Sequence, residues 1–120
     1  MKAQSFTDLI VWQKGHQFIL AVYKALSIFP KEETYGLSSQ IKRAVVSITS
    51  NIAEGFNRHS KKEKVQFYYI ALGSLSEVQN QLLIARDLGF IKKDDFALLS
   101  DKTIELSKLT NGLINSIINS

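Results

Sequence analysis

Basic side chains gather in one part of this chain, and they are the residues whose type and spacing could do chemistry. The chain of 120 residues has a formal net charge of +4. Between positions 41 and 64, six basic residues stand against two acidic ones, whereas the rest of the chain carries nine of each sign. The whole surplus is therefore local, as expected for a surface that binds an anionic partner such as a nucleic acid. The six basic residues are Lys42, Arg43, Arg58, Lys61, Lys62 and Lys64.

These six residues are predicted to contact phosphates through their positive charge. No motif that reads bases accompanies them. Four of them surround the turn before a predicted helix, whose first amides also favour anions. The other two, Lys42 and Arg43, lie about 15 residues earlier, roughly 20 Å away along an antiparallel helix. One chain therefore presents two basic patches, and binding to RNA or DNA should have little sequence specificity. The alternative is a solvated charged turn on a protein-interaction scaffold that has no nucleic-acid role.

The residue patterns that support catalysis or metal binding are missing from the chain. It has no cysteine and only two histidines, His16 and His59, and neither has the local signature of a base oriented by a carboxylate. No glutamate is followed three residues later by histidine, which argues against the dimetal site of many four-helix bundles. Neither a phosphate-binding Gly-x-x-x-x-Gly-Lys-Ser/Thr loop nor Gly-x-Gly-x-x-Gly occurs. We therefore expect a protein that is not an enzyme, with no catalytic residues, no metal and no cofactor.

Four long helices must position the basic residues. Apolar residues recur at helical spacing throughout the chain, without strand-like alternation. Ser5 and Thr7 are predicted caps for the first helix, Pro30 ends it, Ser60 and Glu63 form a capping box, and Gly89 closes the third helix. The predicted helices cover residues 8–29, 36–57, 61–88 and 94–118. Their short connections predict one all-α domain over residues 1–120, an antiparallel up-down-up-down four-helix bundle.

Particular residues within the first two helices are predicted to shape the packing. In the first helix, Trp12, Ile19 and Leu26 form a seven-residue series that should face inward, with Gly15 as a close-packing point.

The end of the second helix carries the structural residues Asn51, Glu54 and Gly55. Gly55 is predicted to be the C-terminal glycine of this helix, and the alternative is that the helix continues to Asn57. Asn51 lies between two apolar turns and either faces a polar group of a partner or, as we favour, makes a structural hydrogen bond.

The apolar arcs of the helices are wider than a monomeric bundle needs. Consecutive helical residues lie about 100° apart, so a run of adjacent apolar residues cannot face one core. Such surplus apolar surface marks a protein interface, although single exposed apolar residues are normal. We therefore predict a homo-oligomer. The runs lie at residues 9–12, 45–46, 67–69, 82–84 and 98–99, and the predicted interface residues are Phe67, Tyr69, Leu83 and Val46.

Composition and the first residues of the chain predict a soluble, cytoplasmic protein without a membrane partner. Hydrophobic residues make up 45% of the chain, as in ordinary globular proteins. The segment from Met1 to Ser5 lacks the apolar core of a signal peptide, and no apolar run approaches the roughly 18 residues of a membrane span. The absence of cysteine fits a reducing compartment.

Three blocks of sequence resemble a known family of four-helix bundles. They are Gln40-Ile41-Lys42-Arg43-Ala44, Asn51-Ile52-Ala53-Glu54-Gly55 and Ala71-Leu72-Gly73-Ser74. The family includes proteins encoded by intervening sequences in bacterial large-subunit rRNA genes, and it is similar to the accessory variability determinant of diversity-generating retroelements. The resemblance covers nearly the whole chain, although Thr49 stands where a small residue or proline is expected.

This resemblance implies an antiparallel four-helix bundle that assembles into a homopentamer and has no established enzymatic activity. The retroelement relatives bind nucleic acid and a reverse transcriptase through basic surfaces. A second copy of the chain is therefore one implied partner, RNA or DNA another, and a reverse transcriptase a third if the gene lies in a retroelement.

Overall fold

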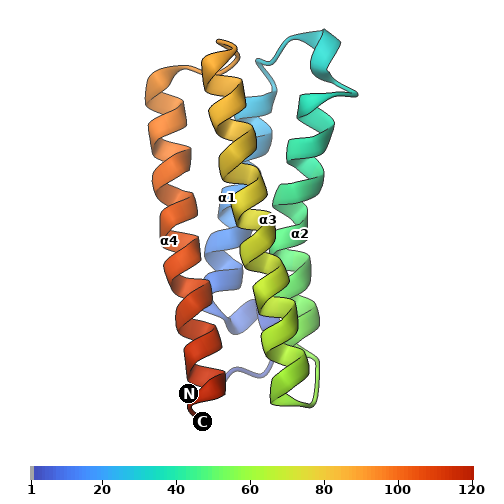
Figure 1. Ribbon diagram of the computed structural model, residues 1–120, viewed down its shortest axis with the longest axis vertical. Coiled ribbons are helices and arrows are strands. Elements are labelled where there is room, and N and C mark those ends of the chain that lie inside the picture. The colour runs from blue at the N-terminus through green and yellow to red at the C-terminus, as the bar shows by residue number, and fades with distance from the viewer. Residues whose placement is uncertain (1) are drawn as a thin grey trace.

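Four helices alternate in direction and form one bundle (Figure 1). The computed structural model describes residues 2–120. Each helix packs against its two neighbours, and α1 also contacts α4, which closes the ring. The predicted all-α four-helix fold is confirmed, and no helix within residues 2–120 is long and apolar enough to cross a membrane. The elements are η1 (Phe6–Asp8), α1 (Ile10–Leu26), η2 (Lys31–Glu33), α2 (Leu37–Phe56), α3 (Lys61–Asp87) and α4 (Lys93–Ile118).

The first helix is shorter than the predicted range 8–29, because separate local structures occupy both of its flanks. Asp8 Oδ2 accepts a hydrogen bond from the amide of Ser5 at 3.1 Å, and this capping box closes the short 3-10 turn η1 instead of α1. At the other end, the hydroxyl of Ser27 donates to a carbonyl of the last turn at 2.6 Å. Pro30 has no amide hydrogen to continue α1, and it is the N-cap residue of η2.

The other three helices begin and end within one residue of their predicted limits. The hydroxyl of Ser60 accepts an amide hydrogen of the first turn of α3 at 3.1 Å. At the end of α3, Gly89 has a φ of 78°, a left-handed conformation that glycine adopts easily. The amides of Gly89 and Phe90 donate to the carbonyls of Arg86 and Ala85 at 3.0 and 2.9 Å, which is a Schellman motif.

The inward side of α1 differs from the predicted series. Trp12 and Ile19 are only partly buried. The ring of Phe6, which η1 folds back over α1, lies edge-on to Trp12 with centroids 5.4 Å apart. This contact holds the indole at the margin of the core. Leu26 of the predicted series is buried, as is Gly15, and the other buried residues of α1 are Val11, Phe18 and Val22.

Two glycines allow α2 to lie close to its neighbours. A Cβ on Gly15 would lie 2.8 Å from Cγ2 of Thr49, so Gly15 is a close-packing point. Gly55 was expected to cap the end of α2, and this is wrong: it lies inside the helix, which ends at Phe56. A Cβ on Gly55 would lie 2.6 Å from Cε1 of Tyr68, so the glycine makes room for an aromatic ring of α3.

Asn51 takes part in a short row of polar groups between α2 and α3. Its Nδ2 donates to the carbonyl of Ser47 at 2.8 Å and to Oγ of Ser47 at 3.0 Å. Ser74 of α3 donates to the same Oγ at 2.9 Å. Asn51 is half-buried, and its amide group is used within the chain.

Candidate nucleic-acid interface

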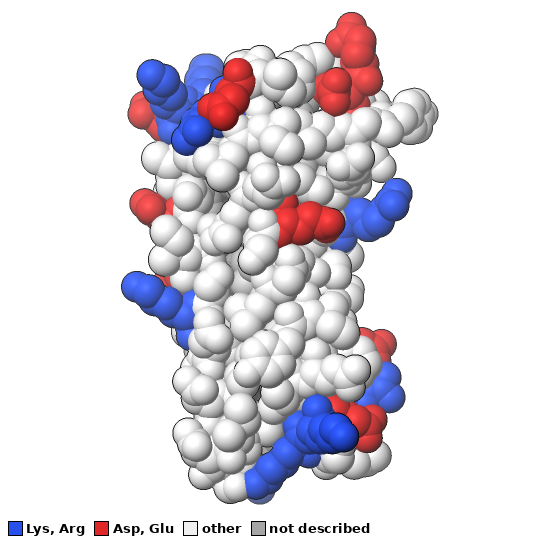
Figure 2. Space-filling model, viewed as in Figure 1, with Lys and Arg blue, Asp and Glu red and all other residues white. Residues whose placement is uncertain are grey.

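The connection between α2 and α3 places exposed basic residues at one end of the bundle. Lys61 and Lys62 are the first two residues of α3, and both are exposed. Figure 2 shows basic groups at this lower end of the molecule, where α3 begins. The positive end of the 27-residue helix adds to their charge, although Glu63 in the first turn offsets part of it. This end therefore attracts anions.

Lys64 does not extend into solvent with its neighbours, because it closes the end of the preceding helix. Its Nζ donates to the carbonyl of Phe56 at 2.6 Å and to that of Gly55 at 3.4 Å. It also lies 5.5 Å from the centroid of the Phe56 ring. A lysine that satisfies the last carbonyls of a helix stabilises that helix end. The structure thus gives Lys64 a role within the chain.

Arg58 is held by an acidic residue and an aromatic ring. Its Nη2 lies 3.0 Å from Glu54 Oε2, one helical turn earlier, and its guanidinium carbon lies 4.7 Å from the centroid of Phe67. The side chains of Arg58 and Glu54 remain 42% and 58% exposed. Exposed pairs of this kind contribute little to stability, so the guanidinium can exchange its partner for a phosphate.

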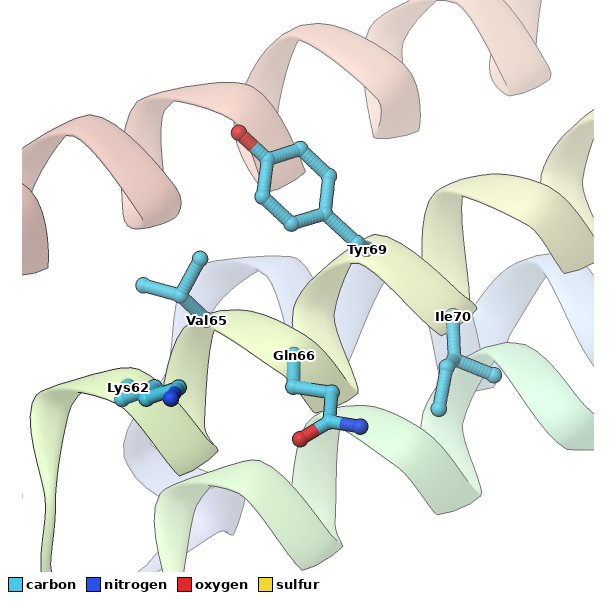
Figure 3. A pocket seen from close by; sticks show the side chains of 5 residues that line it. All are labelled: Lys62, Val65, Gln66, Tyr69 and Ile70. Carbon is cyan, nitrogen blue, oxygen red and sulfur yellow. The ribbon is translucent and has the colours of Figure 1, made fainter.

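Lys61 and Lys62 differ in their surroundings. Lys61 Nζ donates to the backbone carbonyl of Ser120, so the start of α3 lies beside the end of α4. Lys62 lines an open hollow of about 580 Å³ on the outer side of α3, together with Val65, Gln66, Tyr69 and Ile70. In Figure 3, Tyr69 leans towards α4 while Gln66 and Ile70 lie on the side of α2. A charged group and an exposed aromatic ring therefore share one surface.

The second predicted patch, Lys42 and Arg43, stays separate from the first. Both residues are exposed on α2. Nζ of Lys42 lies 5.2 Å from the centroid of Tyr23 on α1, which turns it towards the upper end of the bundle. Figure 2 shows the basic groups in several separate places, with an almost uncharged area over α3 between them. No single continuous basic groove joins the six residues on this face.

Apolar side chains are exposed along α3, as the runs of apolar residues predicted. In the run 67–69, Tyr68 is 1% exposed, Tyr69 is 54% exposed, and Phe67 is half-buried beneath Arg58. Leu83 and Val46, the other predicted interface residues, are both exposed. Ile70 and Ile84 are exposed on α3 as well; Ile84 lies in the predicted run 82–84, whereas Ile70 lies outside the predicted runs. Their exposure depends on how α3 is rotated in the bundle.

Burial raises the pKa of the Tyr68 phenol above its ordinary value. A folded-state pKa above the unfolded value means that the folded protein holds this proton more tightly. The associated stability is present below the unfolded pKa of about 10 and is lost as the pH rises through the folded pKa. We expect the free energy of unfolding to fall more steeply above about pH 10 in the wild type than in Tyr68→Phe, measured by urea denaturation. Parallel pH curves for the two proteins would contradict this assignment.

Metal ligands do not cluster in the described part of the chain. Residues 2–120 contain no group of three or more histidine, cysteine, aspartate or glutamate side chains that could hold a metal ion. The chemistry that the basic end offers is therefore charge and hydrogen-bond donation from lysine and arginine, beside an apolar, partly aromatic surface.

The comparisons with known proteins agree with this architecture. Residues 7–112 match the family model described as 23S rRNA-intervening sequence protein. A solved structure with the same fold is that of a protein with unknown function from the S23 ribosomal protein family of Bacteroides thetaiotaomicron VPI-5482. It is 22% identical, its TM-score is 0.82, and the similarity covers 91% of this chain and 98% of that chain. This likeness supports the fold alone, and no curated protein matches the chain.

Proposed function

The chain belongs to the 23S rRNA-intervening sequence protein family, and from this premise we propose that it is a non-enzymatic homo-oligomer that binds nucleic acid through the basic end of the bundle. The observation that carries the proposal is the pair Lys61 and Lys62 at the start of α3. Both residues are exposed and neither forms an ion pair within residues 2–120, although the ammonium group of Lys61 donates to the backbone carbonyl of Ser120. The family is named for intervening sequences of 23S rRNA, which makes RNA the first ligand to test.

The six basic residues contribute to this proposal in different ways. Lys61 and Lys62 are the primary phosphate contacts, and Arg58 joins them when it leaves Glu54. Lys64 supports the site by holding the end of α2 in place. Lys42 and Arg43 form a second patch that a long nucleic acid reaches on the same copy or on a neighbouring one.

Binding should depend on the two lysines through their phosphate contacts. We expect Lys61→Ala/Lys62→Ala to weaken RNA binding and to lower the slope of log affinity against log salt by about 2, because each lost phosphate contact removes about one unit. The loss should be similar for different RNA sequences, since the contacts do not read bases. Fluorescence anisotropy across a salt series measures both quantities.

The chain offers a matched control for this experiment. Lys92 and Lys93 are also an adjacent, exposed lysine pair at the start of a helix, but they lie at the other end of the bundle. Lys92→Ala/Lys93→Ala changes the net charge equally and should leave most of the binding intact. Equal losses in both double variants would mean that only overall charge matters. A wild-type protein that binds neither RNA nor DNA at low salt would refute the nucleic-acid function.

Self-association is the second part of the proposal, and the exposed apolar side of α3 supports it. Assembly would bring copies of the basic end together, so that their phosphate contacts add. The family resemblance suggests a pentamer. A protein-interaction scaffold without a nucleic-acid role is the alternative, and the almost uncharged area over α3 in Figure 2 favours it if RNA and DNA do not bind.

We expect light scattering to give a mass at least twice the 13.5 kDa of a single chain. Tyr69→Arg should shift this mass towards that of one chain, because it places a charge in the proposed interface. Tyr35→Arg is the control, since Tyr35 is 96% exposed in the loop before α2. A wild-type mass of 13.5 kDa would rule out self-association.

A further inference from the structure

A smaller cavity lies where α1 ends and α2 begins, and Lys42 is the one lining residue that the proposed function also uses. Its volume is about 270 Å³, close to the lower limit of small-molecule sites, which is about 300 Å³. Leu26 and Phe29, both buried, and the exposed ring of Tyr23 form its apolar side. In Figure 1 this region is at the opposite end of the bundle from the connection between α2 and α3. It is therefore separate from Lys61 and Lys62.

Two lysines line this cavity without a compensating acid. Lys31 comes from η2 and Lys42 from α2. Neither forms an ion pair within the part of the chain that the structure describes. The nearby Glu33 is not among the lining residues, and its Oε1 accepts a hydrogen bond from the amide of Leu37 at 3.1 Å. Both lysines are exposed at this half-open cavity, and two positive charges on one concave surface favour an anion there.

A serine that is largely buried lines the same space. Ser38 lines the cavity with 6% of its surface exposed, and no residue in the range 2–120 forms a hydrogen bond with its hydroxyl. The hydroxyl of Thr34, also at the cavity, likewise has no partner there. The hydroxyl of Ser27, by contrast, already donates to a backbone carbonyl. Neither hydroxyl is sealed from solvent, so each can exchange a water molecule for a ligand oxygen in the cavity.

We propose that this cavity binds a phosphate monoester. At neutral pH such a group carries a charge of about −1.5 to −2, which matches two ammonium groups, and its oxygens accept hydrogen bonds from Ser38 and Thr34. The Glu33 carboxylate already occupies the first amide of α2, so the attraction for the anion comes mainly from the two lysines. The apolar side contacts the organic part of the ester. The ester is either a free small molecule or the terminal phosphate of a nucleic-acid strand.

Calorimetric titration of the full chain tests this site with two probes, glycerol 3-phosphate and a short 5′-phosphorylated oligonucleotide. The controls are glycerol and the same oligonucleotide without its 5′-phosphate. We expect the phosphorylated form of at least one to bind better by tenfold or more. Lys31→Gln and Ser38→Ala should each raise its Kd by about five- to tenfold. Lys24→Gln, a nearby exposed lysine that does not line the cavity, should leave the Kd unchanged. Circular dichroism verifies that each variant is folded.

The two probes distinguish the sources of the phosphate. Preference for glycerol 3-phosphate over glycerol identifies a free ester, and preference only for the 5′-phosphorylated oligonucleotide identifies a strand end. The proposal is overturned if neither phosphate form binds at millimolar concentration, or if Lys31→Gln and Ser38→Ala bind as the wild type does. Binding of internal RNA segments through Lys61 and Lys62 should be unchanged in Ser38→Ala, so this site and the proposed function can fail separately.

Discussion

Replacing Gly55 by alanine should lower the free energy of unfolding by about 1–3 kcal/mol. A helix is normally more stable by about 1 kcal/mol with alanine than with glycine at an interior position. A loss of stability in Gly55→Ala would therefore have to come from packing. The added Cβ would lie 2.6 Å from Cε1 and 3.0 Å from Cδ1 of Tyr68, and 3.1 Å from Cβ of Phe67. A buried aromatic ring beside the α2 backbone cannot move away without disturbing its own neighbours.

Gly73 provides the matched control, because it is also a glycine within a long helix. A Cβ at Gly73 has no atom within 4 Å. Gly73→Ala should therefore raise the free energy of unfolding by up to about 1 kcal/mol. Urea denaturation at one protein concentration compares the two variants directly. If Gly55→Ala is as stable as Gly73→Ala, the close contact with Tyr68 does not control the packing of α2 on α3.

Truncating Tyr68 to alanine should cost about 3–5 kcal/mol, the largest effect that we expect from a single side chain. The ring is 1% exposed and lies among the buried residues of α3 that face α2. Its loss leaves a cavity that the surrounding helices can fill only in part. The adjacent Tyr69 is 54% exposed, so Tyr69→Ala should change the stability of the single chain by no more than about 0.5 kcal/mol.

The effects of substitutions at Gly55 and Tyr68 should also be coupled. In a Tyr68→Leu background, Gly55→Ala should cost less than in the wild type, because the ring that it would meet is gone. Residues in direct contact commonly show coupling free energies of about 0.5–3 kcal/mol. Additive costs in this double-mutant cycle would contradict the packing. The contact lies next to Phe56, whose carbonyl holds Lys64, so it also supports the connection that presents Lys61 and Lys62.

Much of the fold could be predicted from the sequence, because the signals that begin and end these helices are local. Ser60 caps α3 and Gly89 ends it through hydrogen bonds to residues at most five positions away. Where two local signals compete, the prediction was wrong. The capping box at Ser5 belongs to η1, and α1 begins only afterwards.

For the candidate interface, the sequence predicts the positions of the basic residues but not all of their contacts. A count of charges located all six of them, since charge is a property of each residue alone. It could not show that Lys64 is used on the carbonyls of α2, because this depends on the path of the chain between α2 and α3. The pair formed by Glu54 and Arg58 follows from their spacing of four residues on one helix, so the sequence contains it.

The sequence by itself determined the four helices, the caps of α3, the location of the charge surplus and the excess of apolar residues. Only the tertiary structure decided which apolar residue of each run is buried, why Gly55 is a glycine, and that Lys31, Ser38 and Lys42 line one cavity. The physical reason is the distance along the chain between the groups that interact. Caps and helical periodicity arise from groups a few residues apart, whereas helix rotation, close packing and cavities arise from contacts between helices, which no local pattern specifies.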